Sequence, residues 1–420
     1  MKVLHLSTED LGIGGGASKG SYWLHQGLQK AGVDSQIMVG IKYTDDPTVI
    51  GPKTKREKVF NKFLRPQLDA IPLSFYETDK ELLFSPSWVP NNIHDRIEKV
   101  NPDIINLHWV CRSFVTPESL RKFKKPIVWT LRDMWAFTGG CHYAWNCKQY
   151  FNKCGSCPQL NSNKEGDLSR KLWQRKNKAW QNLEINLAPI SNWLAECARK
   201  SSLFNDCRRI KVIPNALNAS NYRPLNKPTV REILGFSQEA KIILFGASNA
   251  IKNKIKGFDY LVSALQQLAK SGWGDRAELV VFGASEPKES PDVGMKATFM
   301  GRLNDDISLS LVYAAADVTV MPSIQEGFGK VAMESLACGT PVVSFDSTGL
   351  KDVVEHQKNG YRAECFSSED LARGIAWVLE DEERWQVLSR RSREKVEQEF
   401  TFEVQAQAYI KLYEEILSDR

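Results

Sequence analysis

The stretch PSIQEGFGKVAMESLACGTPVVSFDSTGLKDVVEHQKNG, Pro322–Gly360, decides the fold of this chain. It follows directly on Val318–Met321, a short apolar run that predicts a buried strand. Glu326 then precedes a glycine loop, and the residues from about Lys330 to Ala337 have the pattern of a helix. Strand, glycine loop and helix in this order form the unit of a doubly wound parallel sheet, which binds ligands at the carboxyl ends of its strands. We therefore expect a ligand site at this loop.

Two carboxylates flank the start of the predicted helix. Glu326 and Glu334 stand about 10 Å apart along the element, at a rise of about 1.5 Å per residue. Between them, the free N–H groups of the helix start suit a diphosphate. Isolated glutamates are usually solvated surface residues. Here Gly327, Gly329 and the Cys-Gly-Thr-Pro run at 338–341 accompany them, and the set favours a sugar nucleotide, with one carboxylate on the sugar and one on the ribose.

The length and composition set wider bounds. A chain of 420 residues is too long for one compact domain, so two domains of about 200 residues are expected. Hydrophobic residues at 42% and charged residues at 25% exclude a disordered chain, a collagen-like repeat and a disulfide-dense miniature protein. The net charge of +6 is mild for this length, and no nucleic-acid partner is predicted.

The sequence predicts a cytoplasmic location. No apolar run approaches the ~18 residues that span a bilayer. The N-terminal apolar stretch is too short for a signal peptide, and Glu9 and Asp10 interrupt it.

Strand and helix patterns alternate in both halves of the chain, which indicates parallel sheets covered on both faces. Pro214, Pro224 and Pro228 mark a connection between the halves. The architecture predicted is two successive doubly wound α/β units with a ligand cleft between them. The strand candidates are residues 2–6, 35–39, 104–107, 127–131 and 186–190, then 241–246, 278–283, 318–321 and 341–344.

The opening stretch resembles the signature of family-4 retaining glycosyltransferases of the GT-B fold, P-S-x-x-E-G-F-G-x-x-x-x-E-x-x-A-x-G-x-P-V-V. Further similarities extend over nearly the whole chain and are specific for the family rather than for a substrate. They are Ile213-Pro214-Asn215 with Tyr222 and Pro224, Lys256-Gly257-Phe258-Asp259, Phe299-Met300-Gly301-Arg302-Leu303 and Ala315-Ala316-Asp317.

The resemblance implies two Rossmann-like domains that face each other across a cleft. An acceptor-side domain of residues 1–216 plus 401–420 and a nucleotide-sugar domain of residues 217–400 are expected. The helix predicted at Thr401–Leu417 would cross back to the first domain.

The resemblance also implies roles on the donor side. Glu326 would contact the donor sugar, Glu334 the ribose, and Lys256 the leaving diphosphate, where a fixed cation acts on developing charge. Family members usually have an Arg directly after the Phe245-Gly246 position, which is followed here by Ala and Ser; Lys252 or Lys254 is the candidate replacement. The other donor-binding residues expected are Gly15, Gly16, Gly327, Phe328, Gly329, Lys330, Arg302, Leu303 and Lys254.

In the first half, the glycine loop at 12–17 also fits a dinucleotide fingerprint. That reading needs an acid at the end of the second strand, whereas Asp34 precedes the strand, so an NAD site is disfavoured. The resemblance places the loop near the donor diphosphate. It makes His108 a catalytic residue that contacts the sugar or the incoming hydroxyl. Arg132 and Asp133 would lie on the acceptor side, although many members have His-Asp at this place.

Four cysteines crowd into the insert at 138–160, with the spacing C-x5-C-x6-C-x2-C. In a cytosolic chain, Cys141, Cys147, Cys154 and Cys157 predict a closed structural zinc site, in which His142 could replace one thiol. One or two disulfides, free thiols or an iron–sulfur cluster remain alternatives. The insert resembles that of a subgroup associated with colanic-acid-type exopolysaccharide assembly.

Two basic stretches are amphipathic. Six Lys and Arg residues between 53 and 65 surround Val59, Phe60, Phe63 and Leu64. Residues 170–181 show the same mixture of basic and apolar residues, with Trp173 and Trp180 as the aromatic ones. They are either ordinary surface helices or sites of docking to the inner face of an anionic membrane.

The function predicted is a retaining hexosyltransferase of surface or exopolysaccharide biosynthesis. It would use a UDP- or GDP-linked sugar and a glycan or lipid-linked oligosaccharide acceptor. No Asp-x-Asp motif is present to hold a metal beside the diphosphate, so no catalytic cofactor is expected. A nucleotide-sugar epimerase of the same fold, or a non-catalytic scaffold that binds sugar nucleotides, are the alternatives.

Overall fold

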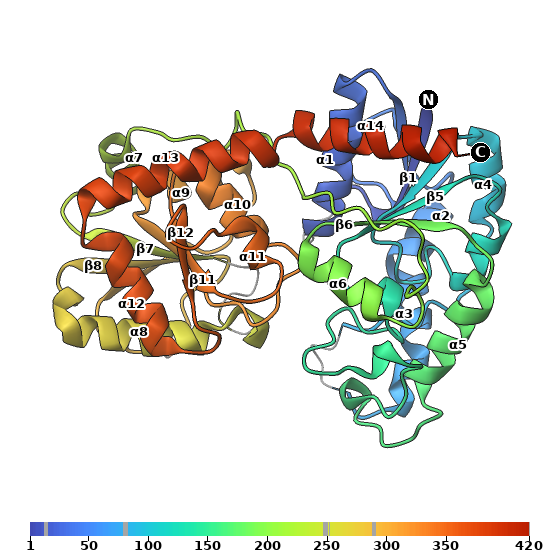
Figure 1. Cartoon of the computed structure of the whole chain (residues 1–420), viewed down its shortest axis with the longest axis horizontal. Helices are drawn as coiled ribbons and strands as arrows, with labels where there is room; N and C mark the ends of the chain where they lie inside the picture. Colours follow the sequence, from blue (N-terminus) through green and yellow to red (C-terminus); the bar gives the residue numbers. More distant parts are fainter. Residues whose placement is uncertain (12–15, 79–82, 247–250, 252, 288–290, 420) are drawn as a thin grey trace. The chain divides into compact units, whose positions relative to one another are not determined.

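The computed structural model describes residues 1–419 except 12–15, 79–82, 247–250, 252 and 288–290 (Figure 1). The chain divides into two compact units. Unit 1 comprises Met1–Pro214 and Gln405–Arg420, and unit 2 comprises Asn215–Val404. The sequence alone drew these borders at residues 216/217 and 400/401.

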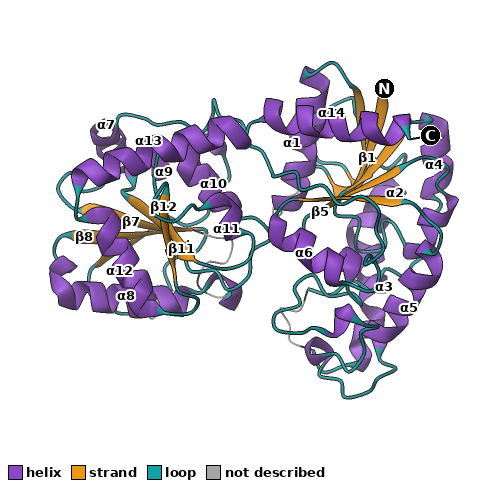
Figure 2. Ribbon diagram, viewed as in Figure 1, coloured by secondary structure: helices purple, strands orange, loops and turns teal. Residues whose placement is uncertain are grey.

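Unit 1 is built on a parallel sheet of six strands in the order β3-β2-β1-β4-β5-β6. Helices lie on both faces of the sheet (Figure 2). The strands are β1 (Lys2–Glu9), β2 (Asp34–Ile41), β3 (Val49–Ile50), β4 (Ile104–Leu107), β5 (Ile127–Leu131) and β6 (Ile185–Pro189). The longer helices are α1 (Gly16–Lys30), α4 (Ile93–Val100), α5 (Leu168–Trp180) and α6 (Asn192–Lys200).

Short helical segments make up much of the rest of unit 1. A run of four covers residues 55–75: α2 (Lys55–Val59), η1 (Phe60–Leu64), α3 (Arg65–Ala70) and η2 (Ile71–Phe75). Single turns follow at η3 (Pro117–Lys122), η4 (Trp135–Phe137), η5 (Gln149–Phe151) and η6 (Pro158–Leu160).

Unit 2 repeats this architecture with a second parallel sheet, in the order β12-β11-β10-β7-β8-β9. The strands are β7 (Lys241–Gly246), β8 (Ala277–Phe282), β9 (Lys296–Phe299), β10 (Val318–Met321), β11 (Val342–Phe345) and β12 (Gly360–Ala363). The helices are α7 (Lys227–Leu234), η7 (Lys254–Lys256), α8 (Phe258–Leu268), η8 (Ala269–Trp273), α9 (Asp306–Ala315), α10 (Lys330–Ala337), α11 (Leu350–Val353), α12 (Ser368–Leu379) and α13 (Glu382–Glu399).

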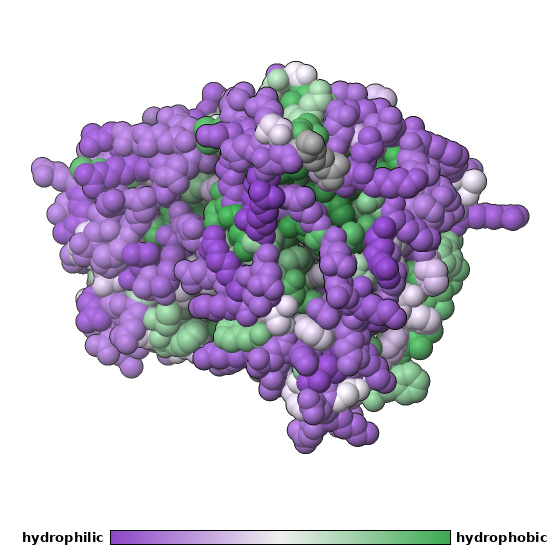
Figure 3. Space-filling model, turned by 45° about the vertical axis from the view of Figure 1, so that its right-hand side comes forward, coloured by the Kyte–Doolittle hydropathy of each residue, from purple (hydrophilic) through white to green (hydrophobic). Residues whose placement is uncertain are grey.

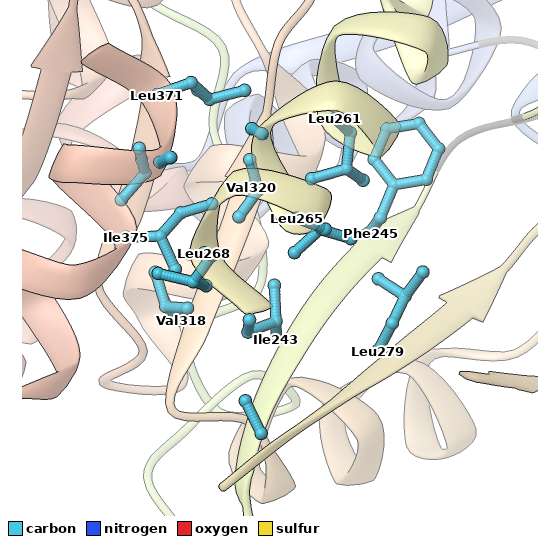
Figure 4. Packing of buried hydrophobic residues seen from close by; sticks show 14 of the residues in the cluster. Ile243, Phe245, Leu261, Leu265, Leu268, Leu279, Val318, Val320, Leu371 and Ile375 are labelled. Atoms are coloured by element: carbon cyan, nitrogen blue, oxygen red, sulfur yellow. The ribbon is translucent and has the colours of Figure 1, made fainter. Parts of the chain in front are cut away.

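The core of unit 2 explains why the apolar runs of the sequence become strands. Ile243, Leu279 and Val320 are fully buried, and Figure 4 shows the sheet residues packed against Leu261 and Ile375 from the helices α8 and α12. A strand buried on both faces must be apolar at nearly every position, which is the pattern of these segments.

The C-terminal helix α14 (Phe402–Ser418) belongs to unit 1 from Gln405 onward. Ala406, Tyr409 and Tyr413 are fully buried in one cluster with Val3 and Val128 of the sheet. Figure 1 shows the helix in red beside α1, at the opposite end of the colour scale. The predicted return of the last helix to the first domain is confirmed.

The two sheets share the strand order 3-2-1-4-5-6, which changes direction between β1 and β4 and between β7 and β10. Ligands of doubly wound sheets bind beyond the carboxyl ends of the strands at such a switch point. The prediction of two Rossmann-like α/β units is confirmed. Among the described helices, none combines the length and the hydrophobicity required to cross a bilayer.

Candidate functional site

Lys256 and Glu326, which the sequence placed in the catalytic machinery, meet at the switch point of unit 2. Lys256 lies in η7 beyond β7, and Glu326 lies in the loop beyond the neighbouring strand β10. The Lys256 Nζ donates to Glu326 Oε1 in an ion pair. The two side chains keep 22% and 14% of their surface exposed, so the pair is sheltered yet reachable.

A glycine lets the two loops touch. Gly257 has a φ of +69°, and a Cβ at this position would lie 1.9 Å from the carbonyl oxygen of Pro322. Next to this contact, the Ile324 N–H donates to the Ile255 carbonyl over 2.8 Å. Only a residue without a side chain fits this close approach of two backbones, which is what brings Lys256 to Glu326.

The loop beyond β11 holds Glu326 from the other side. The Glu326 N–H donates to Thr348 Oγ1 over 3.0 Å, and its carbonyl accepts from the Gly349 N–H over 3.0 Å. Ser323 Oγ lies 3.3 Å from the carboxylate. Two hydrogen bonds therefore hold the backbone of Glu326, and Ser323 and Lys256 contact its carboxylate.

Glu334 lies on α10 as predicted, but almost fully buried, with 1% of its side chain exposed. Its Oε2 accepts from the Tyr313 hydroxyl over 3.0 Å, and Lys330 Nζ lies 2.9 Å from Oε1. Burial and then the charge of Glu334 raise the pKa of Tyr313 well above its usual value, so the phenol stays a donor. Sequence reasoning missed Tyr313, since a Tyr in an apolar helix gives no signal of a polar partner.

The remaining donor-side residues differ in how far they are exposed. Phe328 is buried with its ring 5.3 Å from that of Phe400, so its side chain serves packing. Gly329 begins α10 with a φ of +105°. Gly16, Arg302 and Lys254 are exposed, and Gly327 and Leu303 are partly buried; Gly15, Ala247, Ser248 and Lys252 lie outside the described residues.

In unit 1, His108 follows β4 and contacts a second histidine. Its Nε2 lies 2.9 Å from Nδ1 of His5, and the rings are 3% and 0% exposed. Burial, helped by the nearby charge of Arg132, lowers the pKa of both histidines well below the usual value. Both imidazoles are therefore neutral at physiological pH.

His108, Arg132 and Asp133 line one recess together with Trp109, Trp129 and Trp135. Burial lowers the pKa of Arg132 to about 10, which leaves the guanidinium charged at neutral pH. The guanidinium lies against Gly20 of α1, where a Cβ would come within 2.4 Å of Nη1. The structure thus brings the three predicted acceptor-side and catalytic residues of unit 1 into one place.

His142, from the cysteine-rich insert, contacts Asp133 of this recess. Its Nδ1 lies 2.6 Å from Asp133 Oδ2, and its Nε2 lies 2.9 Å from Ser85 Oγ. Asp133 Oδ1 accepts from the Trp135 N–H over 2.9 Å. Both ring nitrogens of His142 are therefore engaged by oxygen atoms, and the histidine serves to hold Asp133.

The four clustered cysteines line a single cavity. All nine cysteines of the chain lie in its described part and are free thiols. The Gly139 N–H donates to Cys154 Sγ over 3.2 Å, while burial raises the pKa of Cys154 to about 12. Among the described residues, no group of three or more His, Cys, Asp or Glu side chains is arranged to hold a metal ion.

Zinc in the insert therefore stays a prediction of the sequence. If the sequence prediction holds, protein purified without chelator contains about one zinc per chain, with the four cysteines that line the cavity drawn together as the ligands of a closed tetrahedral site. Elemental analysis checks this, and Cys147→Ser with Cys154→Ser is expected to release the metal. A content below about 0.2 zinc per chain would rule it out.

Known proteins similar to this chain are glycosyltransferases. Residues 226–395 match the family described as Glycosyl transferases group 1, a segment that contains Lys256, Glu326 and Glu334. An uncharacterized glycosyltransferase of Methanocaldococcus jannaschii, MJ1607, is 32% identical over 192 residues, which are 43% of this chain and 47% of that protein. The chain spans about half the length of the first curated relatives that it matches.

Solved structures match over the whole chain. Sucrose-phosphate synthase from Thermosynechococcus elongatus is 19% identical, with both chains fully covered and a TM-score of 0.69. HepE of Anabaena, solved in complex with UDP and glucose, is 16% identical, with 99% of this chain and 100% of that chain covered and a TM-score of 0.63. At these identities the likeness concerns the fold. The chain therefore has the GT-B fold of two Rossmann-like units, and residues 226–395 of unit 2 are similar to the group 1 glycosyltransferases.

Proposed function

We propose that this protein is a retaining glycosyltransferase that moves a hexose from a nucleoside-diphosphate sugar to a glycan or lipid-linked oligosaccharide. The observation that carries the proposal is the Lys256–Glu326 ion pair at the switch point of the group 1 domain. A cation and a carboxylate held side by side suit a donor whose diphosphate is anionic and whose sugar offers hydroxyl groups.

The proposed chemistry follows from these two charges. As the bond between the anomeric carbon and the diphosphate breaks, negative charge grows on the leaving group, and in this proposal the cation of Lys256 stabilises it. Glu326 accepts hydrogen bonds from sugar hydroxyls and orients the ring. The acceptor hydroxyl attacks from the face that the diphosphate leaves and gives its proton to the departing diphosphate oxygen, so the anomeric configuration is retained.

UDP-glucose is the first donor to test, because a structure of similar fold was solved with UDP and glucose. A panel of UDP- and GDP-linked sugars is screened for thermal stabilisation, since a ligand that binds only the folded state raises its melting temperature. The stabilising donor is then assayed for turnover with and without EDTA, because metal-independent catalysis is proposed. If no sugar nucleotide stabilises the protein, the proposed function is wrong.

For the acceptor, the proposal includes a site at the cytoplasmic face of an anionic membrane. The short helices over residues 55–75 expose a row of large apolar side chains: Val59, Phe63, Leu64, Leu68, Ile71 and Phe75, the last 82% exposed. Exposed Lys53, Lys55, Arg56, Lys58 and Lys62 accompany them. The face in Figure 3 is mostly hydrophilic, with its hydrophobic residues gathered in patches. Apolar and basic side chains on one short helical run fit an anionic bilayer.

Hydrogen bonds of one buried carboxylate, that of Asp69, anchor residues 55–75 to the rest of unit 1. The buried Asp69 accepts from Ser113 Oγ over 2.5 Å and from the Trp88 N–H over 3.2 Å. The second basic stretch has the opposite character, because Trp173 and Trp180 of α5 are only 7% exposed and face the interior. Residues 170–181 are thus an ordinary surface helix, and the docking proposal is limited to residues 53–75.

Wild-type protein is expected to co-sediment with vesicles of phosphatidylcholine and phosphatidylglycerol at low salt. Replacing Phe63 and Phe75 together by Ser should lower the bound fraction at least about fivefold, because each buried CH2 contributes about 0.8 kcal/mol to partitioning. Ile307→Ser is the matched control, since Ile307 is 75% exposed in unit 2, and its binding should not change. Equal binding of the Phe variant and wild type would contradict membrane docking through this segment.

A further inference from the structure

A chain of buried polar groups links the C-terminal helix α14 to His108. Asn106 Nδ2 donates to the Tyr413 hydroxyl over 3.0 Å, although 307 positions separate the two residues. The same Nδ2 lies 3.4 Å from His5 Nδ1 and 3.3 Å from His108 Nε2. Tyr413, Asn106 and His5 are fully buried, and His108 is 3% exposed.

A second tyrosine of α14 holds the other end of the Asn106 amide. The hydroxyls of Tyr409 and Thr130 are 2.8 Å apart, and Thr130 Oγ1 donates to Asn106 Oδ1 over 3.2 Å. The amide oxygen is thereby turned toward Thr130 and the amide nitrogen toward the histidines. The network itself thus decides the orientation of the amide.

The contact with Arg132 favours one tautomer of His108. Arg132 Nη2 lies 3.5 Å from His108 Nδ1, and a guanidinium can only donate. On this ground we assign the lone pair to Nδ1 and the proton of the neutral ring to Nε2, which can then donate to His5 Nδ1 over 2.9 Å. In this assignment the Asn106 amide also donates to His5 Nδ1, and the proton of His5 is on Nε2, which is buried and has no hydrogen-bond partner among the described residues.

We propose that Asn106 and Tyr413 are positioning residues, which hold His5 and through it His108 in the tautomer whose Nδ1 lone pair faces the recess beside Arg132. In that form the single lone pair of His108 Nδ1 accepts from Arg132 in the ligand-free protein and from a sugar hydroxyl that displaces this contact when the donor binds, and α14 takes part in building the site. The inference rests on the proposed function for the identity of the ligand as a sugar.

The stability of the fold alone would not require the Tyr413 hydroxyl and the Asn106 amide. A buried polar group gains little net stability even when it is fully hydrogen-bonded, and apolar replacements of buried polar clusters are often neutral. Leu412 and Ile416 fill neighbouring positions of α14 with apolar contacts alone. A Phe at 413 would keep the ring packing and remove only the hydroxyl that anchors Asn106.

The first arm of the test needs no ligand. Full-length protein labelled with 15N-histidine is compared as wild type, Tyr413→Phe and Leu412→Ala by NMR of the ring nitrogens, with His108→Gln and His5→Gln used for assignment. Wild type is expected to show His108 as a single tautomer with the proton on Nε2. Tyr413→Phe should shift His5 and His108 toward averaged tautomers, whereas Leu412→Ala, a fully buried apolar position of the same helix, should keep the wild-type pattern.

The second arm measures turnover of the donor identified in the panel. Tyr413→Phe is expected to lower kcat about five- to twentyfold, with the donor KM within about twofold, because it disturbs the orientation of a reacting partner rather than donor binding. Tyr409→Phe serves if Tyr413→Phe does not fold. An unchanged tautomer in the tyrosine variants, an equal change in Leu412→Ala, or an unchanged kcat would each overturn the inference. Failure of the proposed function can be told apart from failure of this inference, because in that case no sugar nucleotide of the panel raises the melting temperature.

Discussion

Glu326→Gln is expected to lower kcat/KM for glycosyl transfer by about 10²- to 10³-fold, the size typical of losing one preorganised electrostatic group. The substitution keeps the shape of the side chain and its packing, but it removes the charge that pairs with Lys256. In the proposed function that charge orients the sugar and holds Lys256 for the diphosphate, so both effects would be lost. Initial rates with the donor from the panel measure the effect.

The matched control for this prediction is Glu278→Gln. Glu278 also forms an ion pair, with Lys296 at 3.1 Å, and its side chain is 13% exposed against 14% for Glu326. The control should keep kcat/KM within about twofold of wild type, since removing a partly exposed ion pair changes stability by only about 1 kcal/mol. If Glu326→Gln retains a third or more of the wild-type rate, this loop is not the donor site.

Gly257→Ala is expected to destabilise unit 2 by about 3 kcal/mol or more and to abolish transfer. Two costs add: the alanine must adopt a φ of +69°, and its Cβ would lie 1.9 Å from the Pro322 carbonyl oxygen. Because that atom belongs to the backbone, the loops beyond β7 and β10 must separate. Lys256 then moves away from Glu326. The midpoint of urea unfolding and the transfer rate are the two measurements.

Gly235→Ala isolates the first of these costs. Gly235 has the same φ of +69° and a ψ of 27° against 31° for Gly257, but a Cβ at position 235 would meet no atom within 4 Å among the described residues. The variant should lose only the conformational cost of about 1 kcal/mol and keep its activity. Equal destabilisation by the two substitutions would show that the contact with Pro322 does not matter for stability.

The sequence predicted the secondary elements of the site well because the signals are local. The strand Val318–Met321 and the helix Lys330–Ala337 have the bounds that the apolar pattern indicated. In a parallel sheet the core strands are apolar throughout, and a helix that follows a glycine loop has a marked start. The order of these elements was enough to expect a ligand at the carboxyl end of the strand.

Whether the apolar side chains of a helix are buried was harder to predict from the sequence. Two basic stretches with aromatic residues looked alike in sequence, yet Phe63 and Leu64 are exposed while Trp173 and Trp180 are buried. An amphipathic helix has one apolar face in either case, and the sequence does not say whether that face meets the core or the solvent. His142 likewise stood among cysteines in the sequence but is bound by Asp133 and Ser85.

The sequence by itself determined the two-unit α/β fold and which charged residues follow the strands, because apolar strand runs, glycine loops and charged residues at strand ends are properties of short segments. Tertiary structure alone decided which groups meet. Lys256 finds Glu326 because β7 and β10 are neighbours, and Asn106 finds Tyr413 because α14 returns to the first sheet. Such contacts join residues that are 70 and 307 positions apart, and only the strand order and the packing of whole helices bring them within hydrogen-bonding distance.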